Sequence, residues 1–237
     1  MPADDAEFDI RLRDAKLAAM AELAAGAGHE INNPVATIVG RAQLLLANEA
    51  DPNRRRALAT IASQALRIRD MIGDLMLFAR PPDAEPVEVD LGTIARDVVA
   101  PFADRATEAN VTLTVEATEP VVAFADPLQL TVAVSALVEN ALTAVGGEGH
   151  VTLEVSEPDD RPTLQVRDDG GGWTDADREH AFDPFYSGRQ AGRGLGFGLP
   201  KAWRIVTLAG GTIEIASPPG ETIVTVTLPA PLAQRSS

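Results

Sequence analysis

A histidine followed by a glutamate stands in a stretch otherwise typical of a helix, Gly-His-Glu-Ile-Asn-Asn-Pro at residues 28–34. The carboxylate of Glu30 can hold one imidazole nitrogen of His29 as N–H, which leaves the lone pair of the other nitrogen free to attack an electrophile. Asn33 lies one helical turn later on the same side, and Pro34 removes a backbone hydrogen bond, which predicts a bend just after the histidine. The zinc-protease motif fails, because it needs a second histidine at position 33. The pattern favours a nucleophilic histidine, although an incidental surface histidine would look the same in this stretch alone.

Two glycine-rich stretches could bring backbone N–H groups close to phosphate oxygens. Residues 168–172, Asp-Asp-Gly-Gly-Gly, end a predicted strand, and residues 192–198, Gly-Arg-Gly-Leu-Gly-Phe-Gly, open a predicted helix. Glycine lets a backbone approach closely, and a helix N-terminus favours an anion. The sequence has no glycine–lysine pair, which excludes a Walker P-loop, and a G-x-G-x-x-G pattern begun at Gly192 or Gly194 fails at its last position. Each stretch alone is also what an ordinary loop contains.

Asn140 lies inside a predicted helix, in the stretch Leu-Val-Glu-Asn-Ala at residues 137–141. Asparagine has a low helix propensity, and its amide is costly to bury without partners. The residue is therefore either solvent-facing, which composition alone favours, or part of a site.

Two long amphipathic helices are expected in the first third of the chain. From about residue 9 to 47 the apolar residues recur every three or four positions, and residues 47–53 indicate a turn. The same spacing continues to about Ala79. His29 lies on the side opposite the apolar stripe and should face water. Because two helices with thin stripes cannot make a core alone, we expect a second copy to complete a four-helix bundle; the alternative is a monomeric hairpin packed on the rest of the chain.

A proline-rich linker at residues 81–88 separates this hairpin from a region of mixed helices and strands. Helices are expected near residues 91–109, 127–145 and 196–209, and strands at residues 111–116, 120–124, 149–157, 162–168, 211–216 and 221–228. The last two strands are joined by Ser-Pro-Pro-Gly and predict a hairpin. We therefore expect an α/β sandwich at residues 89–229 and a tail at residues 230–237.

The composition narrows the possible partners and location. The chain has 237 residues and a formal net charge of −15, which argues against a nucleic-acid partner. It has no cysteine, which excludes disulfides and thiolate metal sites. No apolar run approaches the ~20 residues of a membrane span, and the acidic start is unlike a secretion signal. We expect a cytoplasmic chain without membrane contact.

Taken together and in this order, the motifs resemble those of the sensor histidine kinases of two-component systems, over about residues 9–229. The resemblance implies a dimerisation and phosphotransfer hairpin at residues 1–80, followed by a catalytic ATP-binding domain of the GHKL (Bergerat) type. The segment from His29 to Pro34 resembles the phosphoacceptor box. The other matches are to the N box (Asn140), the D-x-G-x-G box (Asp168, Gly170, Gly172), the F box (Phe182, Phe185) and the second glycine box (Gly192, Gly194, Leu195, Gly196).

The resemblance also implies roles for these residues. Asp168 would accept a hydrogen bond from the adenine amino group of ATP, and Asn140 would be a ligand of Mg²⁺. Arg193 or Lys201 would add positive charge around the phosphates. His29 would attack the γ-phosphate with Glu30 as proton acceptor, and the phosphoryl group would pass to an aspartate in the receiver domain of a response regulator. Glu30 and Asn33 also resemble the family's phosphatase motif.

Ala136 stands where gyrase and MutL-type ATPases of the same fold carry the glutamate that activates water. Hydrolysis by that route is therefore disfavoured. Two rival functions remain: an ATPase without a phosphorylated intermediate, disfavoured by Ala136 and by the context of His29, and a nucleotide-binding scaffold that has lost catalysis, disfavoured because every core motif is present. Only about eight residues precede the first predicted helix, so the input domain or signalling partner is expected to lie outside this chain.

Overall fold

The computed structural model describes residues 3–184, 186 and 196–231. Before Glu30 it describes the solvent exposure only of Ala19, Glu22, Gly26 and Gly28. The chain divides into two compact units, residues 1–82 and 83–237, each of which is described by itself. The order expected from the sequence, a helical hairpin followed by an α/β sandwich, is confirmed.

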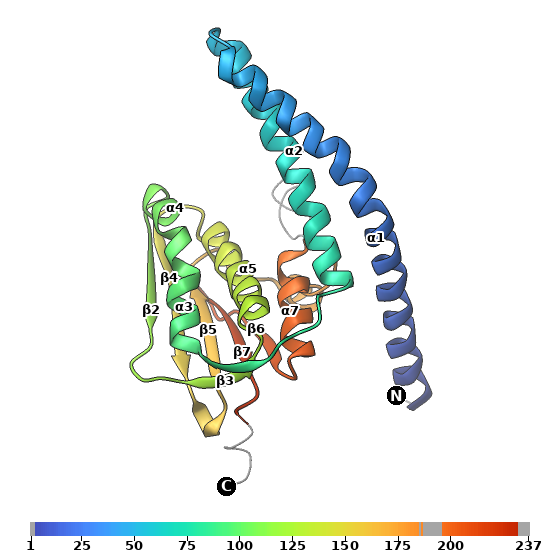
Figure 1. Cartoon of the computed structure of the whole chain (residues 1–237). Helices are drawn as coiled ribbons and strands as arrows, with labels where there is room; N and C mark the ends of the chain where they lie inside the picture. Colours follow the sequence, from blue (N-terminus) through green and yellow to red (C-terminus); the bar gives the residue numbers. More distant parts are fainter. Residues whose placement is uncertain (1–2, 185, 187–195, 232–237) are drawn as a thin grey trace. The chain divides into compact units, whose positions relative to one another are not determined.

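The first unit is a hairpin of α1 (Ala3–Asn48) and α2 (Pro52–Ala79), which pack side by side (Figure 1). The helix α1 begins earlier than residue 9 and continues through Pro34. The turn between the helices is fixed by Asp51, whose side chain accepts the backbone N–H groups of Asn53 (2.8 Å) and Arg54 (3.0 Å). An aspartate at this N-cap position, followed by proline, is a strong start signal for α2.

Only part of each apolar stripe is buried within the hairpin. Small side chains fill the contact between the helices, including Ala42 on α1 and Ala65 on α2. Large apolar side chains elsewhere on the same two helices stay exposed; they are Ile38, Leu44, Leu45, Ile61 and Ile68. A surface of this kind is costly to leave in water, since each such side chain gains about 1.5–3 kcal/mol when it is buried.

The second unit is a sandwich of one five-stranded sheet and a layer of helices (Figure 1). The strand order is β2-β4-β5-β7-β6, with β2 and β4 parallel and the other neighbours antiparallel; β1 and β3 form a separate antiparallel pair. The helices α3, α5 and α7 cover one face of the sheet. The elements run β1 Val87–Asp90, α3 Leu91–Val99, α4 Ala103–Glu108, β2 Val111–Glu116, β3 Val122–Ala125, α5 Pro127–Val145, β4 Gly149–Ser156, β5 Thr163–Asp168, α6 Asp175–Glu179, α7 Gly198–Leu208, β6 Thr212–Ala216 and β7 Thr222–Thr227.

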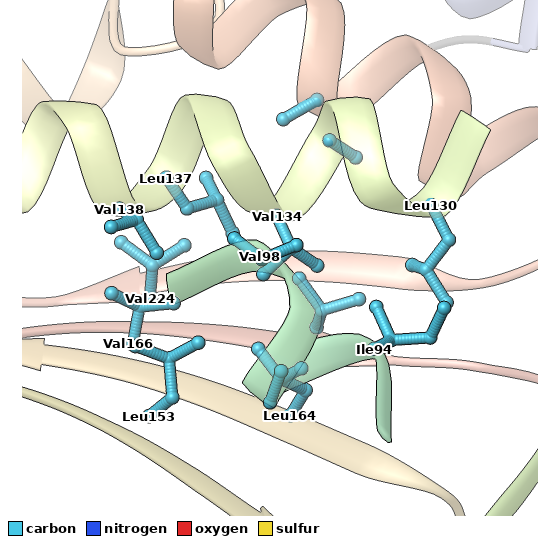
Figure 2. Close-up of a cluster of buried hydrophobic side chains, with 14 of the residues drawn as sticks. Ile94, Val98, Leu130, Val134, Leu137, Val138, Leu153, Leu164, Val166 and Val224 are labelled. Atoms are coloured by element: carbon cyan, nitrogen blue, oxygen red, sulfur yellow. The ribbon is translucent and has the colours of Figure 1, made fainter. Parts of the chain in front are cut away.

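The core lies between the helices and the inward face of the sheet. Figure 2 shows Val134, Leu137 and Val138 of α5 facing Val166 of β5 and Val224 of β7. Side chains alternate along each strand, so that inward positions are aliphatic and outward positions are mostly polar. This alternation decides which strand residues can reach the helices and which face the open side of the sheet.

Three sequence-based expectations need correction. Of the described helices, α5 alone is long and apolar enough to cross a membrane by composition, contrary to the expectation that no stretch approaches a span, yet eight of its residues are buried in the core. The helix expected at residues 91–109 is interrupted by a 3₁₀ turn at Ala100–Phe102, which contains Pro101. The predicted linker at residues 81–88 overlaps β1, because Val87 already pairs with Ala125.

Candidate functional site

Asp168 ends β5 with its side chain on the inward face, where it is 4% exposed. Its Oδ1 accepts the backbone N–H of Gly170 at 3.1 Å. In the sheet Asp168 stands opposite Val151 of β4 and Thr222 of β7. A buried carboxylate at a strand end, directly before a glycine-rich loop, is a strong hydrogen-bond acceptor for a ligand.

Thr222, the neighbour of Asp168 on β7, was missed by the sequence analysis. Its side chain is fully buried, and among the described residues its hydroxyl has no hydrogen-bond partner. A buried polar group without a partner is rare in native proteins and points to a position where a water or a ligand binds. The available signal was its inward position, which it shares with Val224 and Val226 on an otherwise aliphatic face.

The glycines of the first loop allow this strand end to pack closely on α5. A Cβ built on Gly170 would lie 2.6 Å from the carbonyl carbon of Ala144, so no larger residue fits without a shift of backbone. Gly172 has a φ of +70°, a left-handed conformation that favours glycine. The next residue, Trp173, donates its N–H to the Ser217 hydroxyl at 2.8 Å, which ties the loop to the hairpin before β7.

Asn140 lies on α5 one turn before Ala144, the residue on which Gly170 packs. The Asn140 side chain is half-buried and makes an interaction within the protein. The preceding residue, Glu139, is exposed and forms an ion pair with Arg105 of α4 at 3.1 Å. Ala136, one turn earlier on α5, is buried and offers no carboxylate.

Asp169 turns away from Asp168 and binds the start of β4. It accepts the backbone N–H of His150 at 2.8 Å, and its Oδ2 lies 2.9 Å from Nδ1 of the same histidine. These contacts, the backbone N–H first, lower the pKa of Asp169. Of the two adjacent aspartates, only Asp168 is therefore left on the inward face.

The segment after the first loop is held by a small polar network around α6. Thr174 and Asp177 form a reciprocal capping box at the start of this helix. Asp177 also accepts the Tyr186 hydroxyl at 2.7 Å, which raises the pKa of that phenol. A contact of 2.8 Å with Asp183 raises the pKa of the His180 imidazole. Phe182 of the predicted F box packs partly buried against the core, whereas Phe185 lies outside the described residues.

The second glycine box is described only at its end. Gly192, Arg193, Gly194 and Leu195 lie outside the described residues. Gly196 has a φ of +70°, and α7 starts two residues later at Gly198. Lys201 is half-buried in the first turn of α7, which packs against α5, the helix of Asn140. An N-terminus of an 11-residue helix with a cation in its first turn suits an anionic group.

The predicted phosphoacceptor segment belongs to the first unit. Gly28 is buried against α2, where a Cβ would come within 2.8 Å of Sδ of Met76. Glu30 and Asn33 are exposed, and Asn33 accepts the Thr37 hydroxyl on its carbonyl oxygen at 3.0 Å. His29 is placed on α1, while its side chain lies outside the described residues. The structure thus groups Asn140, Asp168, Gly170, Gly172 and Lys201 in one unit, and His29, Glu30 and Asn33 in the other.

The described residues fit Mg²⁺ carried by a phosphate substrate better than an all-protein metal cage. They contain no cluster of three or more His, Cys, Asp or Glu side chains able to hold a metal. Mg²⁺ in phosphoryl-transfer sites typically keeps several waters and takes one or two protein ligands in addition to the substrate phosphates. The half-buried Asn140 amide can supply such an oxygen ligand.

Two family models match the two units. Residues 19–83 match the His Kinase A (phospho-acceptor) domain, and residues 125–232 match the histidine kinase-, DNA gyrase B- and HSP90-like ATPase family. The first match ends at the division between the hairpin and the sandwich, and the second lies within the sandwich.

Similar proteins are consistent with these matches. The chain is 32% identical to the sensor histidine kinase ZraS of Klebsiella oxytoca over 88% of this chain and 46% of that protein. It is 32% identical to the sensor protein kinase PmrB of Pseudomonas aeruginosa over 86% of this chain and 44% of that protein. The chain therefore spans about half the length of these relatives. The crystal structure of full-length ShkA in complex with AMPPNP shares the fold, with a TM-score of 0.77 and 23% identity over 88% of this chain and 45% of that one.

Proposed function

The chain belongs to the sensor histidine kinases of two-component systems, and on that premise we propose that it transfers the γ-phosphoryl group of ATP to His29. Residues 1–80 would form the dimerisation and phosphotransfer domain, and residues 89–229 the catalytic ATP-binding domain. The observation that carries the proposal is the buried pair of Asp168 and Thr222 on one inward sheet face, with the Thr222 hydroxyl unpartnered among the described residues.

The chemistry of this pair suits an adenine ring. An aspartate oxygen accepts a hydrogen from the exocyclic amino group, and a threonine hydroxyl can donate to a ring nitrogen directly or through a water. Gly170, two residues after Asp168, packs directly on the backbone of Ala144 in α5. The phosphates would then extend toward the N-terminus of α7, where Lys201 would contribute positive charge, together with Arg193 a few residues earlier in the sequence.

The reaction requires positioning and charge neutralisation more than covalent help from the protein. An imidazole nitrogen of His29 attacks the γ-phosphorus, and the bond to the oxygen bridging the β- and γ-phosphates breaks. ADP leaves with that electron pair, and the imidazole proton passes to Glu30. Mg²⁺, held by Asn140 and the phosphates, supplies charge neutralisation when bound.

A second transfer would carry the phosphoryl group from His29 to an aspartate of a response-regulator receiver domain. The exposed Asn33 side chain lies one turn from His29. It is suited to orient a water that hydrolyses the regulator's phosphoaspartate and so removes the phosphoryl group again. We place the kinase core in the cytoplasm, without direct contact to nucleic acid or membrane.

A labelling experiment tests the proposal. The chain is incubated with ATP labelled at the γ-phosphate and with Mg²⁺, and the protein-bound label is then exposed to acid and to base. Label that is lost in acid and kept in base indicates phosphohistidine and supports the proposal. Release of inorganic phosphate without labelled protein would instead indicate an ATPase, and a chain that binds ATP without consuming it would indicate a scaffold.

A further inference from the structure

Arg167 directly precedes Asp168 on β5, and its side chain lies on the opposite, open face of the sheet. Its guanidinium holds three partners at once. Nε donates to Glu154 of β4 at 3.2 Å, Nη1 to Glu221 at 3.3 Å, and Nη2 to the side-chain oxygen of Gln165 at 2.8 Å. The arginine thus links β4, β5 and the residue that precedes β7.

This position is significant because Asp168 and Thr222 form the last pair of the β5–β7 ladder. Beyond it β5 runs into the glycine loop, and β7 is preceded by Gly220, whose φ is +81°. Strand ends open more readily than strand centres, since fewer hydrogen bonds hold them. Toward β4 the ladder is extended past Asp168 by the contacts of Asp169 with His150. Toward β7 the hydrogen bond from Arg167 to Glu221 spans the terminal pair.

From this geometry we infer that Arg167 is a positioning residue for nucleobase recognition. It holds Glu154 and Glu221 from the open face and so fixes the spacing between the Asp168 carboxylate and the Thr222 hydroxyl on the inward face. The inference rests on the proposed function. Its consequence is specificity: adenine presents an amino donor where guanine presents a carbonyl acceptor. A rigid carboxylate therefore favours adenine, whereas a displaced one discriminates less.

The burial of the network allows this role to be separated from a general contribution to stability. The side chains of Arg167, Glu154 and Glu221 are 35%, 37% and 38% exposed. Ion pairs at this exposure contribute little to the free energy of unfolding. The same three side chains line a groove of about 440 Å³ on the open face, and Asp168 also lines this groove. A substitution of Arg167 on the open face therefore changes the immediate surroundings of Asp168.

The test compares three variants of the full chain. Arg167→Met keeps an unbranched apolar stem and removes all three hydrogen bonds, and Arg167→Lys keeps the positive charge without the planar guanidinium that serves several partners at once. Arg96→Met is the matched control: Arg96 also pairs with a carboxylate, that of Asp90 at 3.6 Å, but lies on α3. The measurements are the calorimetric affinities for ATP and GTP, the thermal midpoint, and KM for ATP together with kcat of autophosphorylation.

We expect Arg167→Met to weaken ATP binding about three- to tenfold through lost preorganisation while GTP binding changes little. The ATP-to-GTP affinity ratio then falls, KM for ATP rises and kcat stays near that of the wild type. Arg167→Lys should be intermediate, and Arg96→Met should keep the wild-type ratio. An unchanged ratio in Arg167→Met, with or without a lower thermal midpoint, overturns the inference. If Arg167→Met does not fold, Glu221→Met, which removes the acceptor that spans the terminal pair, provides the same comparison. If the wild type did not bind ATP, the proposed function itself would be wrong.

Discussion

A threonine hydroxyl buried without a hydrogen-bond partner lowers the stability of a fold, yet within the described part of the chain the Thr222 hydroxyl, next to the buried Asp168, has no partner. The sequence alone indicated Asp168 as a site residue, because Asp168 and the glycines of its motif are contiguous along the chain. Thr222 could not be found in the same way. Its position beside Asp168 depends on the pairing of β7 with β5, which joins residues far apart in the sequence.

We expect Thr222→Val and Asp168→Asn to lower ATP affinity for separable reasons. The valine removes a hydroxyl that has no partner among the described residues, so the thermal midpoint should stay the same or rise. Asp168→Asn replaces a charged acceptor, and the lost hydrogen bond costs about 1.5–3 kcal/mol, or tenfold and more in affinity. Calorimetry with ATP and thermal unfolding measure both effects. A Thr222→Val chain that binds ATP as tightly as the wild type would remove Thr222 from the site.

His29 and Asn33, one turn apart on α1, should serve opposite reactions. His29→Gln should abolish autophosphorylation, because an amide nitrogen is not a usable nucleophile, and should leave ATP binding by the other unit intact. Asn33→Ala should leave autophosphorylation largely in place and slow dephosphorylation of the regulator, because only the water-orienting side chain is lost. Both rates are measured on both variants. Loss of kinase activity with retained phosphatase activity in Asn33→Ala would assign Asn33 to the transfer step.

Two of the long helices begin at an aspartate N-cap, which is a start signal that can be recognised in the sequence. Asp51 and Asp126, each followed by proline, start α2 and α5, and these long helices were predicted close to their observed ends. The strand β1 was missed, since four residues after a proline-rich segment carry no clear period and form a strand only through pairing with β3. The same pairing explains why the predicted linker is too long.

Asp126 also links α5, the helix of Asn140, to the start of the second unit. Its Oδ1 accepts the N–H groups of Leu128 (2.9 Å) and Gln129 (3.0 Å), and its Oδ2 accepts the N–H of Glu85 at 2.8 Å. The hydrogen bond from Glu85 is the first cause of the lowered pKa of Asp126, followed by that from Gln129.

A lowered pKa in the folded state predicts a pH dependence of stability. The contribution of Asp126 is fully present above the unfolded pKa, near 3.9, and is lost as pH falls through the lower folded pKa. Glu85→Pro removes the donating N–H, so it should raise the pKa of Asp126 toward its ordinary value and reduce this dependence. Glu85→Ala keeps the N–H and is the control. Carboxyl NMR titration and unfolding between about pH 2 and 6 provide the measurement. Equal pKa values of Asp126 in the two variants would contradict the argument.

At the scale of the whole molecule the two units were foreseen from a change in sequence pattern, from a three-to-four spacing to alternating helices and strands. The hairpin leaves large apolar side chains exposed on both helices, and these favour a second copy as the partner that buries them. Sequence periodicity shows an apolar stripe. It does not show which part of the stripe the hairpin buries by itself, because that depends on the packing of small residues such as Ala42 and Ala65 between α1 and α2.

We expect the full chain and the segment of residues 1–80 to sediment as dimers. Ile68 is 44% exposed on α2, and Ile68→Asp should shift both toward monomer, because each protomer loses about 1.5–3 kcal/mol of apolar burial and places a charge in the interface. Ser63, exposed on the other side of α2, is the control in Ser63→Asp. A folded segment that stays monomeric at all concentrations would refute the dimer.

The central claim is that the phosphoryl group of ATP bound by one unit is transferred to a single histidine of the other, and locating the phosphoryl group tests it most directly. The full chain is incubated with Mg²⁺ and ATP, digested at a pH that preserves phosphoramidates, and mapped by fragmentation mass spectrometry. We predict one modified residue, His29, with strongly reduced modification in Asp168→Asn at an ATP concentration below the dissociation constant of the wild type. A phosphoryl group on His150 or His180, or modification at His29 that survives Asp168→Asn unchanged, would contradict the account.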